Sequence, residues 1–154
     1  MPMKAVVQYG GTTNLVYCPG FSQGSRIWKY NPKYGYIIGY NYLGGHNFST
    51  TNFPSYVSWI SPQRMTDGSM LPLMVDPNHW DTEDRWAIIP HGPSGAPRGE
   101  RGGSFIWNNG VAAWQSKAAG GNVGLLDGSV HWRNKGQLSN HIASTHHDRY
   151  IGAW

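Results

Sequence analysis

The chain has 154 residues, a length that suits one domain. Charged residues make up 13% of the chain, about half of the usual share of roughly 25%, while aromatic residues make up 14%. This excludes a coiled coil and argues against disorder. The net charge is +4, with basic residues scattered and no run of five or more, so we expect no nucleic-acid partner.

Short strands separated by turn residues are the pattern of the first half of the chain. An initial segment, 1–20, holds short apolar runs at 4–8 and 14–17. Tyrosine and isoleucine fill residues 34–43, which predicts a strand, and residues 70–76 predict a buried strand in which Pro72 marks an edge or a start. No apolar run approaches the 18 residues of a spanning helix, so we expect no membrane partner for the chain as given.

The second half is predicted to combine a long loop with two hairpins. Residues 77–103 hold four prolines and predict a loop, and so long an irregular stretch is often functional or poorly ordered. The runs 104–107 and 111–115 flank Asn108-Asn109-Gly110, which predicts a hairpin. Residues 134–154 predict a polar tail. The fold class that we expect is α+β, mostly antiparallel β, in a single domain 1–154.

Residues 122–133 (NVGLLDGSVHWR) give the strongest local signal. Asp127-Gly128 between two apolar runs predicts a hairpin with a two-residue type I′ loop. Its register pairs Leu125 with Val130. Strand periodicity then predicts one core face formed by Val123, Leu125, Val130 and Trp132.

The run from Gly120-Gly121-Asn122-Val123 through Asp127-Gly128-Ser129-Val130 resembles the C-terminal signature of the H-X9-DG prepilin-type proteins, which are pseudopilin-like. Tyr17-Cys18-Pro19, with the tyrosine-rich segment after it, is similar to the CP segment of that family. Asp76 ends the LPLMVD run where the family often has a strand ending in Asp. The likeness covers residues 14–135 loosely. The chain departs from the signature at its histidine, which corresponds to Lys117 here.

The resemblance implies a pilin-like globular head with a structural or interaction role in a type II secretion or type IV pilus-like system. It implies a location in the cell envelope or outside the cell. Family members carry a prepilin leader and a long hydrophobic helix at the N-terminus, and the chain shows neither. A sheet face that would pack on that helix is then expected to be exposed, and such faces tend to find partners. We therefore expect a homo-oligomer.

Turn chemistry is the preferred explanation of Asp127 and Gly128, because Asp caps such a turn and Gly supplies a positive φ. The alternative is a carboxylate that binds a cation or a sugar at the loop tip. His131 follows on the non-core face, where a surface histidine is the simpler interpretation.

A second function class remains open, a small carbohydrate-active enzyme or glycan-binding module. Eight tryptophans are many for one small core to hide, and Trp80, His131 and Trp132 are the candidate ligand-binding residues. A glycoside hydrolase needs two convergent carboxylates. The candidates for this role are Asp76, Asp81, Glu83 and Asp127.

Metal chemistry has weak support in the sequence, and we predict no cofactor. The acidic segment 76–84 offers oxygen ligands for Ca²⁺, but its spacing does not match an EF-hand. The single cysteine, Cys18, excludes a zinc knuckle and is expected to be a small buried apolar residue. The seven histidines lack metal-site spacing, so a zinc site would require tertiary convergence.

Overall fold

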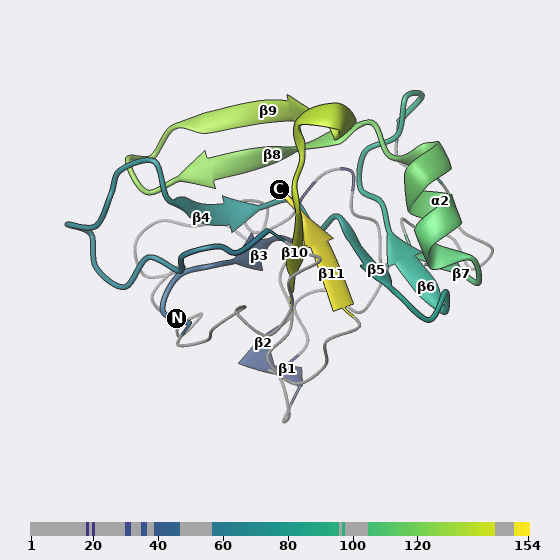
Figure 1. The fold of residues 1–154 in the computed structure, drawn as a ribbon, viewed down its shortest axis with the longest axis horizontal. Coiled ribbons are helices and arrows are strands. Elements are labelled where there is room, and N and C mark those ends of the chain that lie inside the picture. The colour runs from purple at the N-terminus through teal and green to yellow at the C-terminus, as the bar shows by residue number, and fades with distance from the viewer. Residues whose placement is uncertain are drawn as a thin grey trace.

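The computed structural model describes residues 18, 20, 30–31, 35–36, 39–46, 57–95, 97, 105–143 and 150–154. This part of the chain folds into two larger antiparallel sheets and a small two-stranded one, with an α-helix beside one of the larger sheets (Figure 1). The expectation of a mostly antiparallel β structure with some helix is therefore confirmed.

The first sheet contains the hairpin and has the strand order β3-β4-β8-β9. Its strands are β3 (Asn41–Tyr42), β4 (Pro72–Val75), β8 (Gly120–Leu125) and β9 (Val130–Asn134). The predicted strand 70–76 is confirmed as β4, which starts at Pro72, as the missing N–H of proline favours. β4 lies inside the sheet between β3 and β8, whereas β3 and β9 are its two outer strands. The short 3₁₀ helix η3 (Lys135–Gln137) follows β9.

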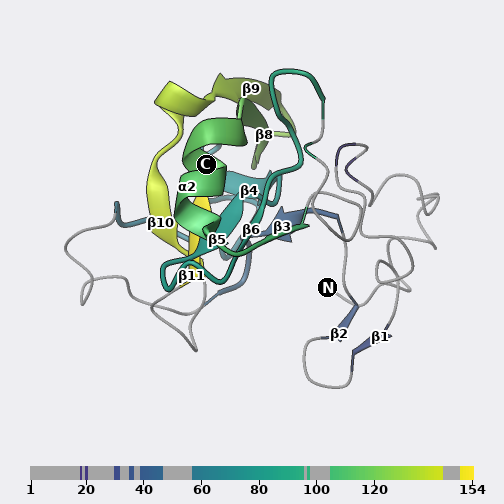
Figure 2. The ribbon, with the colours of Figure 1, turned by 90° about the vertical axis from the view of Figure 1, so that its right-hand side faces the viewer.

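The second sheet has the order β10-β11-β5-β6-β7. Its strands are β10 (Asn140–Ile142), β11 (Tyr150–Ala153), β5 (His79–Asp81), β6 (Trp86–Ile88) and β7 (Phe105–Trp107). Helix α2 (Gly110–Lys117) covers β5 and β6 (Figure 2). Its Trp114 packs on Trp80 with ring centroids 4.6 Å apart. A separate two-stranded ribbon joins β1 (Tyr30–Asn31) to β2 (Gly35–Tyr36).

Each of the two larger sheets has its own apolar cluster. The C-terminus lies between these two sheets (Figure 1). Ile142 and Ile151 are fully buried in the cluster of the second sheet. Trp154 follows β11 but packs in the cluster of the first sheet with Val75 and Val123. The C-terminal tryptophan therefore connects the two cores.

The prediction that Val130 and Trp132, on the second strand of the 122–133 hairpin, face the core is wrong. Gly128 N–H donates to the carbonyl of Leu125, and Leu125 N–H donates to that of Ser129, so the loop has three residues rather than two. Gly128, with φ of 88°, is the left-handed residue of such a loop. The register shifts by one residue, and Val130 pairs with Gly124 instead of Leu125.

That shift reverses the environment of the β9 side chains. Val123 and Leu125 are buried as predicted, but Val130 is 66% exposed and Trp132 is 46% exposed. The hairpin itself is confirmed. Its apolar residues on β9 face outward and do not contribute to the core.

Two further predictions, the loop at 77–103 and the hairpin of 104–107 with 111–115, are wrong in the described residues. Residues 77–103 are not simply a loop, because β5 and β6 form a tight hairpin with Asp84 in a left-handed conformation at its turn. Residues 111–115 form helix α2 instead of a strand. Asn108 and Asn109 do have the positive φ values of a turn. This turn leads into the helix and not into a second strand, and the Asp84 carboxylate accepts the N–H of Val111 at the start of the helix.

The predicted polar tail 134–154 carries β10 and β11, which form part of the core. Of the strand predicted at 34–43, the ends form β2 and β3, with a bend at residues 39–40. The short strands predicted at 4–8 and 14–17 lie outside the described residues. No helix in the described part of the chain is long and apolar enough to cross a membrane.

Candidate functional site

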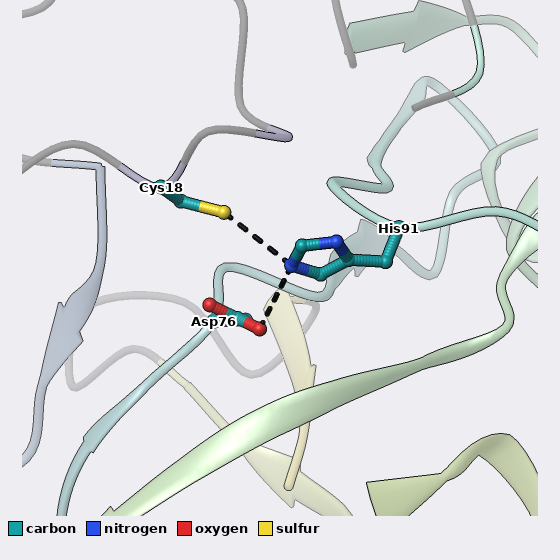
Figure 3. Close-up of side chains that lie close together, drawn as sticks. All are labelled: Cys18, Asp76 and His91. Carbon is teal, nitrogen blue, oxygen red and sulfur yellow. Dashed lines mark hydrogen bonds and ion pairs between the residues drawn. The ribbon is translucent and has the colours of Figure 1, made fainter. Parts of the chain in front are cut away.

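Three side chains of different chemistry converge beside the first sheet (Figure 3). Cys18 comes from the N-terminal part of the chain, Asp76 follows β4 directly, and His91 is the third residue after β6. The His91 Nε2 atom lies 3.0 Å from Asp76 Oδ2 and 3.4 Å from Cys18 Sγ. All three ligand-type atoms lie within 4.8 Å of one another. We call Cys18, Asp76 and His91 the convergent cluster.

The convergent cluster is shielded from solvent. Cys18 is 1% exposed and the Asp76 side chain 1%, while the His91 side chain retains 25% exposure. Asp76 is held by Asn122 on β8, whose backbone N–H and side-chain amide both donate to Oδ2, at 2.6 and 2.9 Å. The second carboxylate oxygen, Oδ1, is buried and has no hydrogen-bond partner among the described residues. The sheet therefore positions the carboxylate through one oxygen and leaves the other unpaired.

The neighbouring groups strongly favour a cationic form of the His91 ring. The hydrogen bond to Asp76 and then the contact with Cys18 raise the pKa of His91 to about 10, against the opposing effect of burial. Nearby, burial and the charges of Cys18 and Asp76 raise the pKa of Tyr40. The cluster is thus a place where positive charge is stabilised by two acidic side chains.

Two further residues enclose His91. The Trp132 indole packs edge-on against the imidazole, with ring centroids 5.4 Å apart. On another side Gly20 approaches so closely that a Cβ there would lie 3.0 Å from two ring atoms of His91 and 2.2 Å from the carbonyl oxygen of Pro90. Glycine is therefore required where the Cys18-Pro19-Gly20 segment meets His91.

The arrangement does not match a nucleophile–base–acid relay. In such a triad the nucleophile and the carboxylate contact opposite ring nitrogens of the histidine, so that the acid orients the base. Here Cys18 and Asp76 contact the same nitrogen, Nε2. Cys18 is also buried, which restricts access of a substrate to its sulfur. The geometry therefore places three donor atoms around one point.

The four predicted carboxylates have four different partners. Asp76 contacts His91 and Asn122, and the buried Asp81 accepts the backbone N–H of Glu83 at 2.8 Å. Glu83 forms a 3.0 Å ion pair with Arg85 at the surface. The exposed Asp127 accepts the N–H and hydroxyl of Ser129, at 2.9 and 2.7 Å. None of these contacts joins two of the four carboxylates.

The remaining predicted site residues are dispersed. Trp80 is buried in the core of the second sheet, and His131 is exposed on β9 with its Nε2 3.1 Å from the Ser129 hydroxyl. Lys117 ends α2 with an exposed side chain. Trp132 is the predicted ligand-binding residue that reaches the convergent cluster.

Of the convergent cluster, the sequence analysis named Asp76, as a candidate catalytic carboxylate, but did not name Cys18 or His91 as site residues. Both missed residues stand beside turn signals, Cys18-Pro19-Gly20 and His91-Gly92-Pro93, which bring backbone segments close together. Their separation along the chain gives no motif, so tertiary structure alone unites them.

Comparison with protein-family models, with curated proteins and with solved structures found no match for this chain. The likeness to the H-X9-DG prepilin-type proteins therefore stays a prediction.

Proposed function

We propose that this chain is a pseudopilin-like structural domain, which acts by binding other subunits in a secretion or pilus-like assembly of the cell envelope. The observation that carries the proposal is the exposed apolar side of the outer strand β9, formed by Val130 and Trp132. The Asp127-Gly128 turn supports it, because the Asp127 carboxylate is engaged by its own turn. The signature motif then has an architectural role: it presents β9 at the edge of the sheet.

The proposed partner is a second copy of the chain. The outer side of β9 offers backbone groups that can extend a sheet. Antiparallel pairing of two β9 strands about His131 sets Val130 of one copy opposite Trp132 of the other, which joins the two apolar surfaces. The same patch then serves both subunits, as in a two-fold interface.

Self-association is tested by light scattering after size-exclusion chromatography over a range of concentrations. We expect a dimer for the wild type and a monomer for Val130→Lys, because the lysine charge would be buried in the interface. Met65→Lys is the matched control, since Met65 is 79% exposed in a turn that belongs to a different segment from β9. A wild-type monomer at every concentration, or an unchanged dimer in Val130→Lys, contradicts the proposed pairing.

Glycan binding is the second candidate, supported by the 46% exposed indole of Trp132. An exposed indole provides a flat apolar face on which a sugar ring can stack. A glycan array probed with the wild type and Trp132→Ala tests this candidate. Binding that is lost in the variant supports it, and an array without signal contradicts it.

A further inference from the structure

We propose that Cys18, Asp76 and His91 together bind one transition-metal ion, and that Zn²⁺ is the ion that fits best. This site is independent of the proposed self-association. It rests on the convergence of sulfur, nitrogen and oxygen atoms around one point.

The spacing of the donor atoms suits a small tetrahedral ion. With Zn–S of about 2.3 Å and Zn–N and Zn–O of about 2.0–2.1 Å, neighbouring ligands of a tetrahedral zinc lie about 3.3–3.6 Å apart. The observed separations are 3.4 Å between Cys18 Sγ and His91 Nε2 and 3.0 Å between His91 Nε2 and Asp76 Oδ2. A shift of a few tenths of an ångström would bring the sulfur–nitrogen pair to its ligand distance, and the contact with Oδ2 places the Asp76 carboxylate within reach of the same nitrogen.

The unpaired oxygen of Asp76 is a second and independent indication of a ligand. Oδ2 accepts two hydrogen bonds from Asn122, but Oδ1 is buried with no hydrogen-bond partner among the described residues. A buried carboxylate oxygen without a partner is costly. A bound cation would satisfy it, while Asn122 would orient the carboxylate as outer-shell partners of metal ligands do.

The types of donor atom decide which ion is favoured. Calcium takes six to eight oxygen ligands, and Cys18 and His91 do not provide oxygen. Thiolate together with imidazole suits Zn²⁺, and a thiolate with a carboxylate supplies the two negative charges that neutralise a divalent ion in a buried place. Three protein ligands leave one coordination position of a tetrahedral ion for water or another ligand.

The ion would act as a clamp on the fold. It would tie Cys18, in the N-terminal part, to the end of β4 and to the segment that follows β6. Because the unfolded chain lacks the preformed site, binding would stabilise the folded state. We therefore expect the melting temperature to rise with Zn²⁺ and to fall with a chelator.

Cobalt spectroscopy on the full chain tests the site directly. After treatment with a chelator and a thiol-free reductant, Co²⁺ is titrated into the protein. We expect saturation at one equivalent, intense d–d bands of a tetrahedral ion and a thiolate-to-cobalt charge-transfer band, all displaced by Zn²⁺. Cys18→Ala should lose the charge-transfer band, and His91→Ala should lose stoichiometric binding.

Two further variants make the test specific. Asn122→Ala should weaken Co²⁺ binding about 10–100-fold, because it removes one donor that orients Asp76. His131→Ala should bind as the wild type does, since His131 lies outside the convergent cluster. Circular dichroism checks that each variant is folded.

The Co²⁺ titration of the wild-type protein alone can overturn the proposal, so the result does not depend on whether the variants fold. Absence of saturable Co²⁺ binding, or saturation without a thiolate charge-transfer band, would contradict it.

Discussion

The Trp132 indole and the His91 imidazole meet edge-on, with ring centroids 5.4 Å apart and planes at 79° to each other. Trp132 lies on the outer strand β9 and is 46% exposed, so the same indole contacts both the solvent and the histidine. The exposed side of β9 and the convergent cluster are therefore adjacent. A substitution of Trp132 should therefore change the solvent access of the convergent cluster more than it changes the fold.

Trp132→Ala is expected to expose His91. Loss of the indole opens the part of the imidazole that it covers, so hydroxyl radicals should oxidise His91 several-fold faster, as followed by mass spectrometry of digested protein. Val130→Ala is the control, because Val130 lies on the same side of β9 as Trp132, whereas the ring that packs on His91 is that of Trp132. Equal modification rates in the two variants would show that Trp132 does not shield the ring.

The hairpin shows how far local sequence can predict this fold. The turn at Asp127-Gly128 and the burial of Val123 and Leu125 follow from turn residues and strand periodicity. The outward direction of Trp132 does not follow, because it depends on whether the loop has two or three residues. A two-residue loop and a three-residue loop both accept Gly at a position of positive φ. A difference of one residue between them moves every side chain of the following strand to the other face of the sheet.

The remaining errors have a common physical cause, which is tertiary packing that overrides local preference. Residues 111–115 have a strand-like composition, but Trp114 packs on Trp80, and α2 provides this contact. The residues of β11 follow a polar stretch of the sequence, yet Ile151 is fully buried, and β11 lies between two neighbouring strands of the sheet. Likewise, Asp76 was identifiable at a strand end, while its contact with His91 depends on how the two sheets are placed.

Gly20→Ala is expected to separate the Cys18 segment from His91. The added Cβ would lie 2.2 Å from the Pro90 carbonyl oxygen, a backbone atom that cannot move away easily. Overpacking of this kind costs about 1–3 kcal/mol. Urea denaturation should show this loss, and Co²⁺ affinity should fall with it. Gly136→Ala is the control, because a Cβ at Gly136 meets nothing within 4 Å; comparable losses in both variants would disprove the close-approach argument.

Gly128→Ala and Asp127→Ala test the architectural role of the signature turn. Gly128 has φ of 88°, and an L-residue in left-handed backbone costs about 1–2 kcal/mol. Asp127→Ala removes the acceptor for the Ser129 N–H and hydroxyl and should lower stability less. Asp127→Asn keeps a side-chain oxygen and should preserve the turn. Urea midpoints measure all three, and a wild-type midpoint for Gly128→Ala would contradict the role assigned to this glycine.

His79 is expected to make the protein less stable in mild acid. Burial lowers the pKa of His79 from 6.5 to about 4, and its ring is hydrogen-bonded to Asn41. Below pH 6.5 the unfolded chain therefore binds a proton that the folded chain resists until about pH 4. The contribution of His79 is complete above pH 6.5 and is lost as the pH falls from 6.5 to 4, by at most about 3 kcal/mol.

Urea denaturation at several pH values between 4 and 7 checks this prediction. The free energy of unfolding of His79→Gln should decline less steeply with acid than that of the wild type, whatever its value at neutral pH. Some decline should remain, because burial also lowers the pKa of His141, and that loss has the same sign. If His79→Gln keeps the wild-type slope, protonation of His79 does not account for the acid sensitivity.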